Sequence, residues 1–285
     1  MNLQNIFTEI EKQDAEVYER MSGRRKAMKD FSNFAGKVAL ASIPFALGSM
    51  FKKAYGQTPS DIIGVLNYAL TLEYLESEFY KAGVAAPGLI PAGTPAVGAL
   101  TKIRDDENAH VAFLRTAITA SGGTPVTFTA ANFDFTAGGT FSGVFTNYDL
   151  FLAVAQTFED TGVRAYKGQA GNLISSNDVL TAALNIHSVE ARHASHIRYM
   201  RRARQASNPG PLYVGDIRPW ITGNSSNIGS TAVQASYNGE ESTTQAGVDI
   251  RTVGGINLSA EAASGAFDEI LTKDQVLAIV DPFII

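Results

Sequence analysis

The feature that most constrains this chain of 285 residues is a pair of Glu-x-x-His motifs. One lies in DDENAHVAFLR, as Glu107 and His110, and the other in IHSVEARHASHIR, as Glu190 and His193. A chain with this content of glutamate and histidine would contain about 0.2 such motifs by chance. Residues three apart on a helix lie on one face, so each motif directs both side chains to the same region.

Each motif is preceded by a glutamate on an earlier helical segment. Glu73 lies in LTLEYLESEFYKAG and Glu159 lies in AQTFEDTGVRAYKGQ, and a tyrosine follows each glutamate seven residues later, at Tyr80 and Tyr166. The two glutamate segments overlay with an offset of 86 residues, and the two motif segments with an offset of 83. The chain therefore contains a twofold internal repeat, and most of its shared residues can serve a metal site.

Hydrophobic periodicity predicts that these residues lie on four long helices. The predicted helices are 60–83, 93–120, 146–170 and 176–206. Short connections inside each pair predict two antiparallel hairpins, and a Gly-, Thr- and Phe-rich crossover at 121–145 joins them. In such hairpins a glutamate and a motif 31 to 34 residues later face each other near the middle of the helices. We therefore expect four glutamates and two histidines to converge in the core.

A metal is required by the charge of this cluster. Four carboxylates buried together would cost many kcal/mol or would become protonated. Two divalent cations balance four carboxylates and leave both imidazoles neutral. Oxygen and nitrogen donors of this kind suit iron or manganese, and zinc is also compatible. The chain has no cysteine, which excludes disulfides, thiolate zinc sites and iron–sulfur clusters.

A glutamate on one helix and Glu-x-x-His on the next, repeated once, resembles the ferritin-like dinuclear metal carboxylate family, a four-helix bundle with one long crossover. The stretch LNYALTLEYLESEFY, with a Gly-Arg-Arg segment upstream, looks more narrowly like bacterial ferritin-like-domain proteins related to plant desiccation-related proteins. The resemblance covers about residues 60–205. It implies two divalent metal ions, iron first and manganese second, and a mainly α fold. The implied metal ligands are Glu73, Glu107, His110, Glu159, Glu190 and His193. Glu107 and Glu159, or their repeat counterparts, would bridge or chelate.

Other polar residues near the predicted site have two interpretations each. Glu76 lies one turn from Glu73 and would be an accessory carboxylate or part of a solvated face. Its repeat counterpart is Gly162, which would open space beside the metals or permit close helix packing. Tyr80 and Tyr166 would be core aromatics, or would either hydrogen-bond to the ligands or relay electrons. Asp105 and Asp106 would form a solvated edge, or one of them would orient a ligand imidazole.

The sequence divides into three parts: an N-terminal part at 1–57, the helical bundle at 58–206 and a C-terminal extension at 207–285. The N-terminal part combines an amphipathic helical pattern with a twin-arginine-like segment at Arg24-Arg25. It predicts either export to the periplasm or cell envelope, or a retained arm on a cytoplasmic protein. The extension is rich in Gly, Ser, Thr and Asn, which predicts a loop- and β-rich segment packed on the bundle or on a neighbouring subunit, with one short helix at Leu271–Ile279.

The charge and composition of the chain exclude some classes of function. The net charge of −5 combines +3 over residues 1–57 with −8 over the remainder, so the body lacks the basic surface of a nucleic-acid-binding protein. The leading hypothesis is a non-haem di-metal oxidoreductase that reacts with dioxygen or peroxide as a ferroxidase, peroxidase or catalase-like enzyme. Without cysteine, its reducing equivalents would come from an external electron donor. The alternative is a structural or stress-protection protein, assembled as a homo-oligomer, with a structural metal site.

Overall fold

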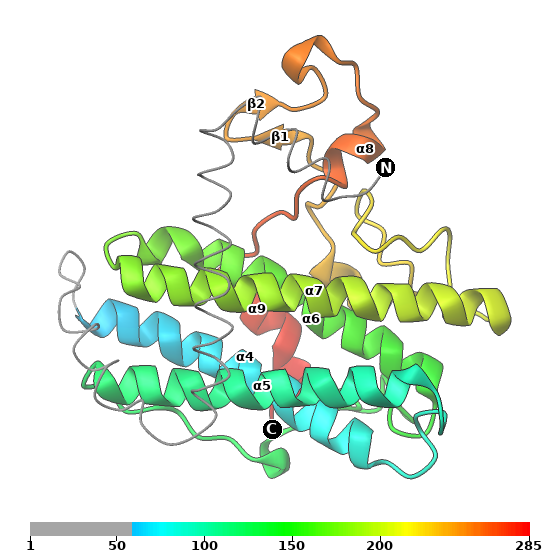
Figure 1. The fold of residues 1–285 in the computed structure, drawn as a ribbon, viewed down its shortest axis with the longest axis horizontal. Coiled ribbons are helices and arrows are strands. Elements are labelled where there is room, and N and C mark those ends of the chain that lie inside the picture. The colour runs from blue at the N-terminus through cyan, green and yellow to red at the C-terminus, as the bar shows by residue number, and fades with distance from the viewer. Residues whose placement is uncertain (1–58) are drawn as a thin grey trace, which may run out of the picture. The chain divides into compact units, whose positions relative to one another are not determined.

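Four long helices form the body of the computed structural model, which describes residues 59–285 (Figure 1). They are α4 (Pro59–Ala85), α5 (Pro95–Ala120), α6 (Tyr148–Ala170) and α7 (Asn177–Ser207). Helix α4 packs along α5, and α6 packs along α7, so the two predicted hairpins are present. The mainly α fold with a long crossover between the second and third helices is confirmed. The predicted N-terminal amphipathic helix and twin-arginine segment lie outside the described residues.

Local sequence signals explain where these helices begin and end. Helix α5 has proline in its first turn, where the missing N–H costs nothing because that group has no partner inside the helix. It ends before Gly122, whose φ of +82° lies in the left-handed region that glycine adopts readily. Helix α6 begins after Asn147, whose side chain accepts hydrogen bonds from the N–H groups of Asp149 and Leu150.

The crossover between the hairpins is anchored near its start and near its middle. Near its start, the Asn67 side chain accepts a hydrogen bond from Val126 N at 2.8 Å and donates one to Thr124 O at 3.2 Å. Further along, the short 3-10 helix η1 (Ala130–Asn132) leads to a bridge between Phe133 and Ile284. The crossover therefore connects the bundle to the C-terminal end of the chain.

Helix α6 is the central helix, and its residues are buried without interruption from Phe151 to Tyr166. One side faces the other three helices, and the C-terminal extension covers the other side. On that covered side Gln156, Asp160 and Arg164 form a stripe with four-residue spacing, and each contacts the extension. Arg164 shows this most clearly, because its guanidinium donates to three backbone carbonyls of the extension and pairs with Glu240.

The extension contains short elements rather than a sheet. In chain order they are η3 (Thr231–Ser236), β1 (Thr244–Gln245), β2 (Val248–Asp249), η4 (Val253–Gly255), α8 (Ala260–Ser264), α9 (Lys273–Val280) and η5 (Asp281–Phe283). Helix α9 corresponds to the predicted short helix. The β-rich character expected of this segment is wrong beyond one two-stranded hairpin, because the polar side chains of α6 and α7 satisfy many backbone carbonyls of the extension. No described helix is long and apolar enough to span a membrane.

Candidate metal centre

All six predicted ligands lie together in the middle of the bundle. Helix α4 contributes one of them, α5 two, α6 one and α7 two. The four glutamates are Glu73, Glu107, Glu159 and Glu190, and each has an exposed fraction of 0%. His110 and His193 are 9% and 6% exposed. Carboxylates this deeply buried need a partner of opposite charge, as the sequence analysis expected.

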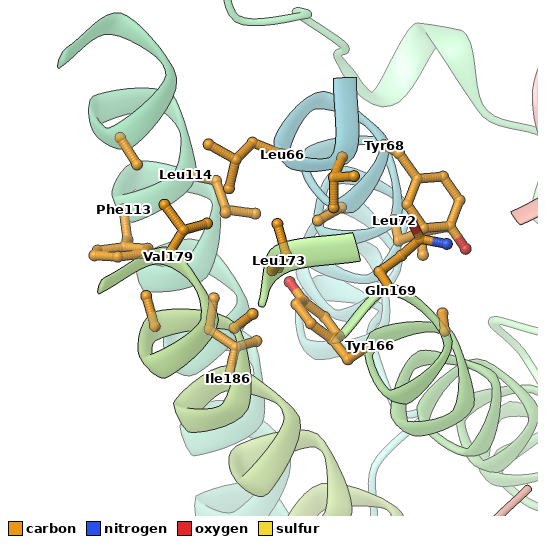
Figure 2. Close-up of a pocket in the computed structure, with 16 residues that line it drawn as sticks. Leu66, Tyr68, Leu72, Phe113, Leu114, Tyr166, Gln169, Leu173, Val179 and Ile186 are labelled. Carbon is orange, nitrogen blue, oxygen red and sulfur yellow. The ribbon is translucent and has the colours of Figure 1, made fainter. Parts of the chain in front are cut away.

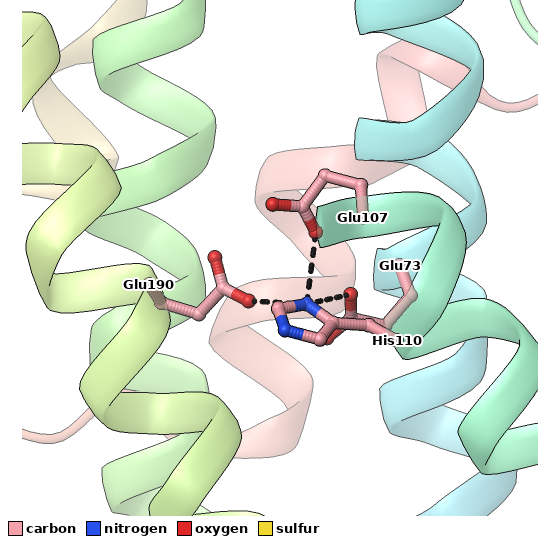
Figure 3. A group of neighbouring side chains, drawn as sticks. All are labelled: Glu73, Glu107, His110 and Glu190. Carbon is pink, nitrogen blue, oxygen red and sulfur yellow. Dashed lines mark hydrogen bonds and ion pairs between the residues drawn. The ribbon is translucent and has the colours of Figure 1, made fainter. Parts of the chain in front are cut away.

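The first group of side chains surrounds the imidazole of His110 (Figure 3). Its Nδ1 lies 3.0 Å from Glu73 Oε2, 3.1 Å from Glu107 Oε2 and 3.0 Å from Glu190 Oε1. The three carboxylates come from α4, α5 and α7, so three helices must pack correctly to create this group.

The second group is the repeat counterpart of the first and surrounds His193. His193 Nδ1 lies 2.8 Å from Glu107 Oε1, 3.5 Å from Glu159 Oε2 and 3.6 Å from Glu190 Oε2. Glu107 and Glu190 belong to both groups, and each directs one oxygen to each imidazole. The sequence paired Glu107 with Glu159, or their repeat counterparts, as the bridging or chelating glutamates. The geometry differs: Glu107 and its own counterpart Glu190 belong to both groups, and Glu159 belongs to the second group alone.

Several atoms of this cluster lack hydrogen bonds within the part of the chain that the structure describes. They are Glu107 Oε1, Glu159 Oε2, both carboxylate oxygens of Glu190 and His193 Nδ1. Each such buried atom costs about 1–3 kcal/mol. These atoms approach one another closely without hydrogen-bonding geometry, as ligand atoms do when they point at a common cation. The donor set of carboxylate oxygen and imidazole nitrogen could therefore hold metal ions.

A family model described as a ferritin-like domain matches residues 61–203. The chain belongs to the ferritin-like domain family. The matched segment includes all six residues of the two groups. No curated protein and no solved structure matches the chain significantly. The narrower relation to desiccation-related proteins stays a prediction. A ferritin-like domain with these buried acidic and histidine groups fits a di-metal protein.

Burial and neighbouring charge determine the proton affinities in this ferritin-like domain without metal. Burial raises the pKa of Glu107 well above its usual range, and the charge of Glu190 adds to this effect. Burial also raises the pKa of Glu159 to about 7, although His193 opposes the shift. Burial alone would lower the pKa of His110, but the Glu73 carboxylate reverses this and raises it. Protons therefore occupy the cluster when no metal does, and metal must displace them.

The two tyrosines predicted near the site bond to glutamates of the opposite repeat. Tyr80, on α4, donates its hydroxyl hydrogen to Glu159 Oε1 at 2.5 Å. Tyr166, on α6, donates to Glu73 Oε1 in the same way. Burial raises the pKa of both hydroxyls well above their usual range, which keeps them protonated and able to donate. Each tyrosine therefore orients one glutamate, whose other oxygen faces an imidazole.

Asp106 contacts the second imidazole from outside the core. Its Oδ2 lies 3.2 Å from Nε2 of His193, whereas Nδ1 of that ring faces the carboxylates. A carboxylate in this position fixes the orientation of a ligand imidazole and its tautomer. The orienting role considered for Asp106 agrees with this geometry. His187 and His196 belong to neither group.

Glu76 breaks the twofold symmetry of the ferritin-like domain. It is 3% exposed, so its interpretation as part of a solvated face is wrong. A Cβ atom on Gly162 would lie 3.2 Å from Glu76 Oε1, so the glycine leaves space for this carboxyl group. Burial raises the pKa of Glu76 well above its usual range, and the charge of Glu190 adds to the shift. The sequence identified Glu76 as a residue of interest, but only the packing shows that its side chain faces the core.

Proposed function

We propose that this protein binds two divalent metal ions, iron in preference to manganese, and reacts with dioxygen or peroxide as an oxidoreductase. The observation that carries the proposal is the sharing of Glu107 and Glu190 by two buried groups of ligand atoms. When bound, a pair of such ions supplies two redox centres within reach of one small oxidant.

The residues of the two groups have distinct proposed roles. Glu73 and His110 would hold one ion, and Glu159 and His193 would hold the other. The two shared carboxylates would contact both ions. Four carboxylates balance two divalent cations with neutral imidazoles, so the charge is compensated inside a region that excludes water.

Tyr80 and Tyr166 would hold Glu159 and Glu73, the two glutamates that are not shared, in place by hydrogen bonding. Their hydroxyls remain protonated donors because they are buried, which supports orientation rather than proton transfer. An external donor would supply electrons, since the chain has no cysteine to carry a redox group. Ferroxidase, peroxidase and catalase-like reactions all use such a site and differ in their substrate and electron source.

A second candidate function is a structural or stress-protection role with a structural metal site. The observation in its favour is the C-terminal extension, which the buried Arg164 and Arg201 attach to the bundle. An addition of this kind, attached to the bundle by polar contacts, fits an assembly protein, and homo-oligomer formation is part of this proposal.

Stopped-flow absorbance separates the two candidates. The full chain, freed of metal, is loaded with Fe(II) without oxygen and then mixed with dioxygen or hydrogen peroxide. The proposed function predicts an absorbance change and consumption of oxidant, both lost when Glu107→Ala is combined with His193→Ala. Two bound ions with no absorbance change and no consumption would support the structural role instead. A chain that binds no metal would exclude both.

A further inference from the structure

An apolar cavity lies beside the candidate metal centre, enclosed by all four long helices (Figure 2). Its volume is about 20 Å³, which suffices for about one molecule the size of water. The side chains around it expose no polar atom to the cavity. Its inner wall includes Leu72, Leu114, Ala165, Tyr166, Leu173 and Ile186.

The cavity adjoins the first group of ligands. Ala69, Leu114 and Ile186 line the cavity, and each lies four residues, or about one helical turn, from a member of that group. Tyr166 connects the two, because its ring lines the cavity and its hydroxyl donates to Glu73. A molecule in the cavity would therefore be separated from the first metal position by about one layer of side chains.

The repeat counterpart of this cavity is filled with aromatic rings. With the 86-residue offset, Val65, Leu72 and Ala165 correspond to Phe151, Phe158 and Phe79. Those three rings are 0%, 2% and 0% exposed. The Phe79 ring stacks on Phe151 at 4.8 Å and meets Phe158 edge-on at 5.1 Å. The two repeats therefore have the same set of candidate ligands, but a cavity lies beside the first group and aromatic rings fill the corresponding space beside the second.

The size and polarity of the cavity select its occupant. Apolar cavities stay dry and bind small apolar molecules. Hydrogen peroxide needs hydrogen-bond partners, which this lining does not offer, and an alkyl chain exceeds the volume. Dioxygen is small and apolar. Val65, Phe113 and Ala183 form part of the wall and are only partly buried, so the cavity also lies close to the surface.

We propose that dioxygen reaches the metal position of Glu73 and His110 through this cavity, which makes the two positions unequal in reactivity. The proposal rests on the proposed function and adds to it a preferred oxidant and a preferred side. It needs a test that detects dioxygen in the cavity separately from any reaction.

Paramagnetic dioxygen speeds the relaxation of nearby methyl groups, which NMR measures on the full chain without redox-active metal. The spectra are compared under several bar of oxygen and under nitrogen. Each methyl group has a control of similar burial in the other repeat. The pairs are Leu66 with Leu152, Leu114 with Ile197, and Ile186 with Ile103. We expect a several-fold larger effect at the first member of each pair. Equal effects would overturn the proposal.

Ala165→Phe introduces a phenylalanine at the position where the other repeat has Phe79, and its ring should fill the cavity. Because added bulk in a packed core is often destabilising, Ala165→Leu is a milder second variant. We expect loss of the relaxation contrast, unchanged Co(II) stoichiometry and a several-fold slower reaction of the Fe(II)-loaded chain with dioxygen. Phe79→Ala, which removes a ring from the filled counterpart of the cavity in the other repeat, should leave the relaxation enhancement at Leu114 unchanged.

The outcomes separate the route from the function. A lost relaxation contrast with an unchanged reaction rate would overturn the route and leave the proposed function intact. A clear contrast in the chain without redox-active metal, combined with an Fe(II)-loaded chain that reacts with neither dioxygen nor peroxide, would overturn the proposed function, and the route with it. A reaction with peroxide alone would overturn the route only.

Discussion

Glu107 and Glu190 differ from the other two glutamates of the site because each faces both imidazoles. Removing a shared carboxylate should therefore disrupt both positions, whereas removing Glu159 should disrupt one. We predict that Glu107→Ala binds no stable metal and that Glu159→Ala keeps one ion per chain. Metal content after gel filtration of the Co(II)-loaded chain measures this directly.

Glu78→Ala provides the matched control for these variants. Glu78 lies on α4 as Glu73 does, but it pairs with Lys81 and belongs to neither ligand group. This variant should keep two ions. If Glu107→Ala and Glu159→Ala lose the same amount of metal, the two carboxylates are equivalent and the assignment of the shared pair is wrong.

The crossed hydrogen bonds of the tyrosines give a second prediction at this scale. Tyr80→Phe removes the donor to Glu159 and should weaken the position of His193 by about 10–100-fold, the usual effect of losing a group that orients a ligand. Tyr166→Phe should weaken the other position instead. Titration with Co(II) measures each effect. The position of His193 is followed in a Glu73→Ala background, and the position of His110 in a Glu159→Ala background. Weakening of the position in the tyrosine's own repeat would contradict the crossed arrangement.

The convergence of the six residues could be predicted from the sequence because the repeat gives each a counterpart, and chance rarely produces two such sets; their role as metal ligands stays a prediction. It does not predict which tyrosine bonds to which glutamate, because that depends on how α4 and α6 face each other. The role of Gly162 is hidden for the same reason: a missing side chain has meaning only once Glu76 fills the space.

At the scale of elements, the outer side of α6 is held by polar rather than apolar contacts. Arg164 is 1% exposed and bonds to Glu240 and to backbone carbonyls of Ser236, Asn238 and Glu269. Arg164→Ala leaves a buried carboxylate without its partner, so we predict a loss of about 3–5 kcal/mol in unfolding free energy. Chemical denaturation measures it, and limited proteolysis should cut the extension first.

Arg202→Ala is the control for this prediction. Arg202 lies on α7 and is exposed, so its substitution should change the unfolding free energy by less than about 0.5 kcal/mol. Similar losses in both variants would show that Arg164 contributes no more than a surface residue does.

Element prediction succeeded for the long helices and failed for much of the extension. The bundle helices have periodic apolar residues and clear terminal signals, such as Pro95 and Asn147, so each predicted end falls within about two residues of the observed one. The extension has no such period. Its backbone follows the polar groups of α6 and α7, and three of the contacts with α6 join residues 70 to 74 positions apart.

For the whole molecule, the buried acids predict an unusual dependence of stability on pH. Glu159 has a pKa of about 7 in the folded chain, so the folded state keeps a proton that the unfolded state loses at lower pH. The contribution of Glu159 to stability is therefore largest at low pH and falls as the pH rises through 7, by about 2 kcal/mol between pH ~5.5 and ~7 for one such group. The raised pKa values of Glu107 and His110 act in the same direction. The pKa of Glu190 is lowered instead, so its contribution to stability is lost as the pH falls, but that loss occurs below pH ~5.5.

Denaturation of the metal-free chain at about pH 5.5 and pH 8 tests this dependence. Added metal should reverse it, because binding displaces protons and is therefore stronger at high pH. A metal-free chain that becomes more stable as the pH rises would show that the cluster does not hold protons as described.

The most direct measurement is anomalous diffraction from crystals of the full chain soaked with Fe(II) or Mn(II). We predict two peaks about 3.5–4 Å apart in the bundle core. One should lie between Glu73 and His110, the other between Glu159 and His193, and both should contact Glu107 and Glu190. A single peak, or two peaks that share no carboxylate, would contradict the di-metal site.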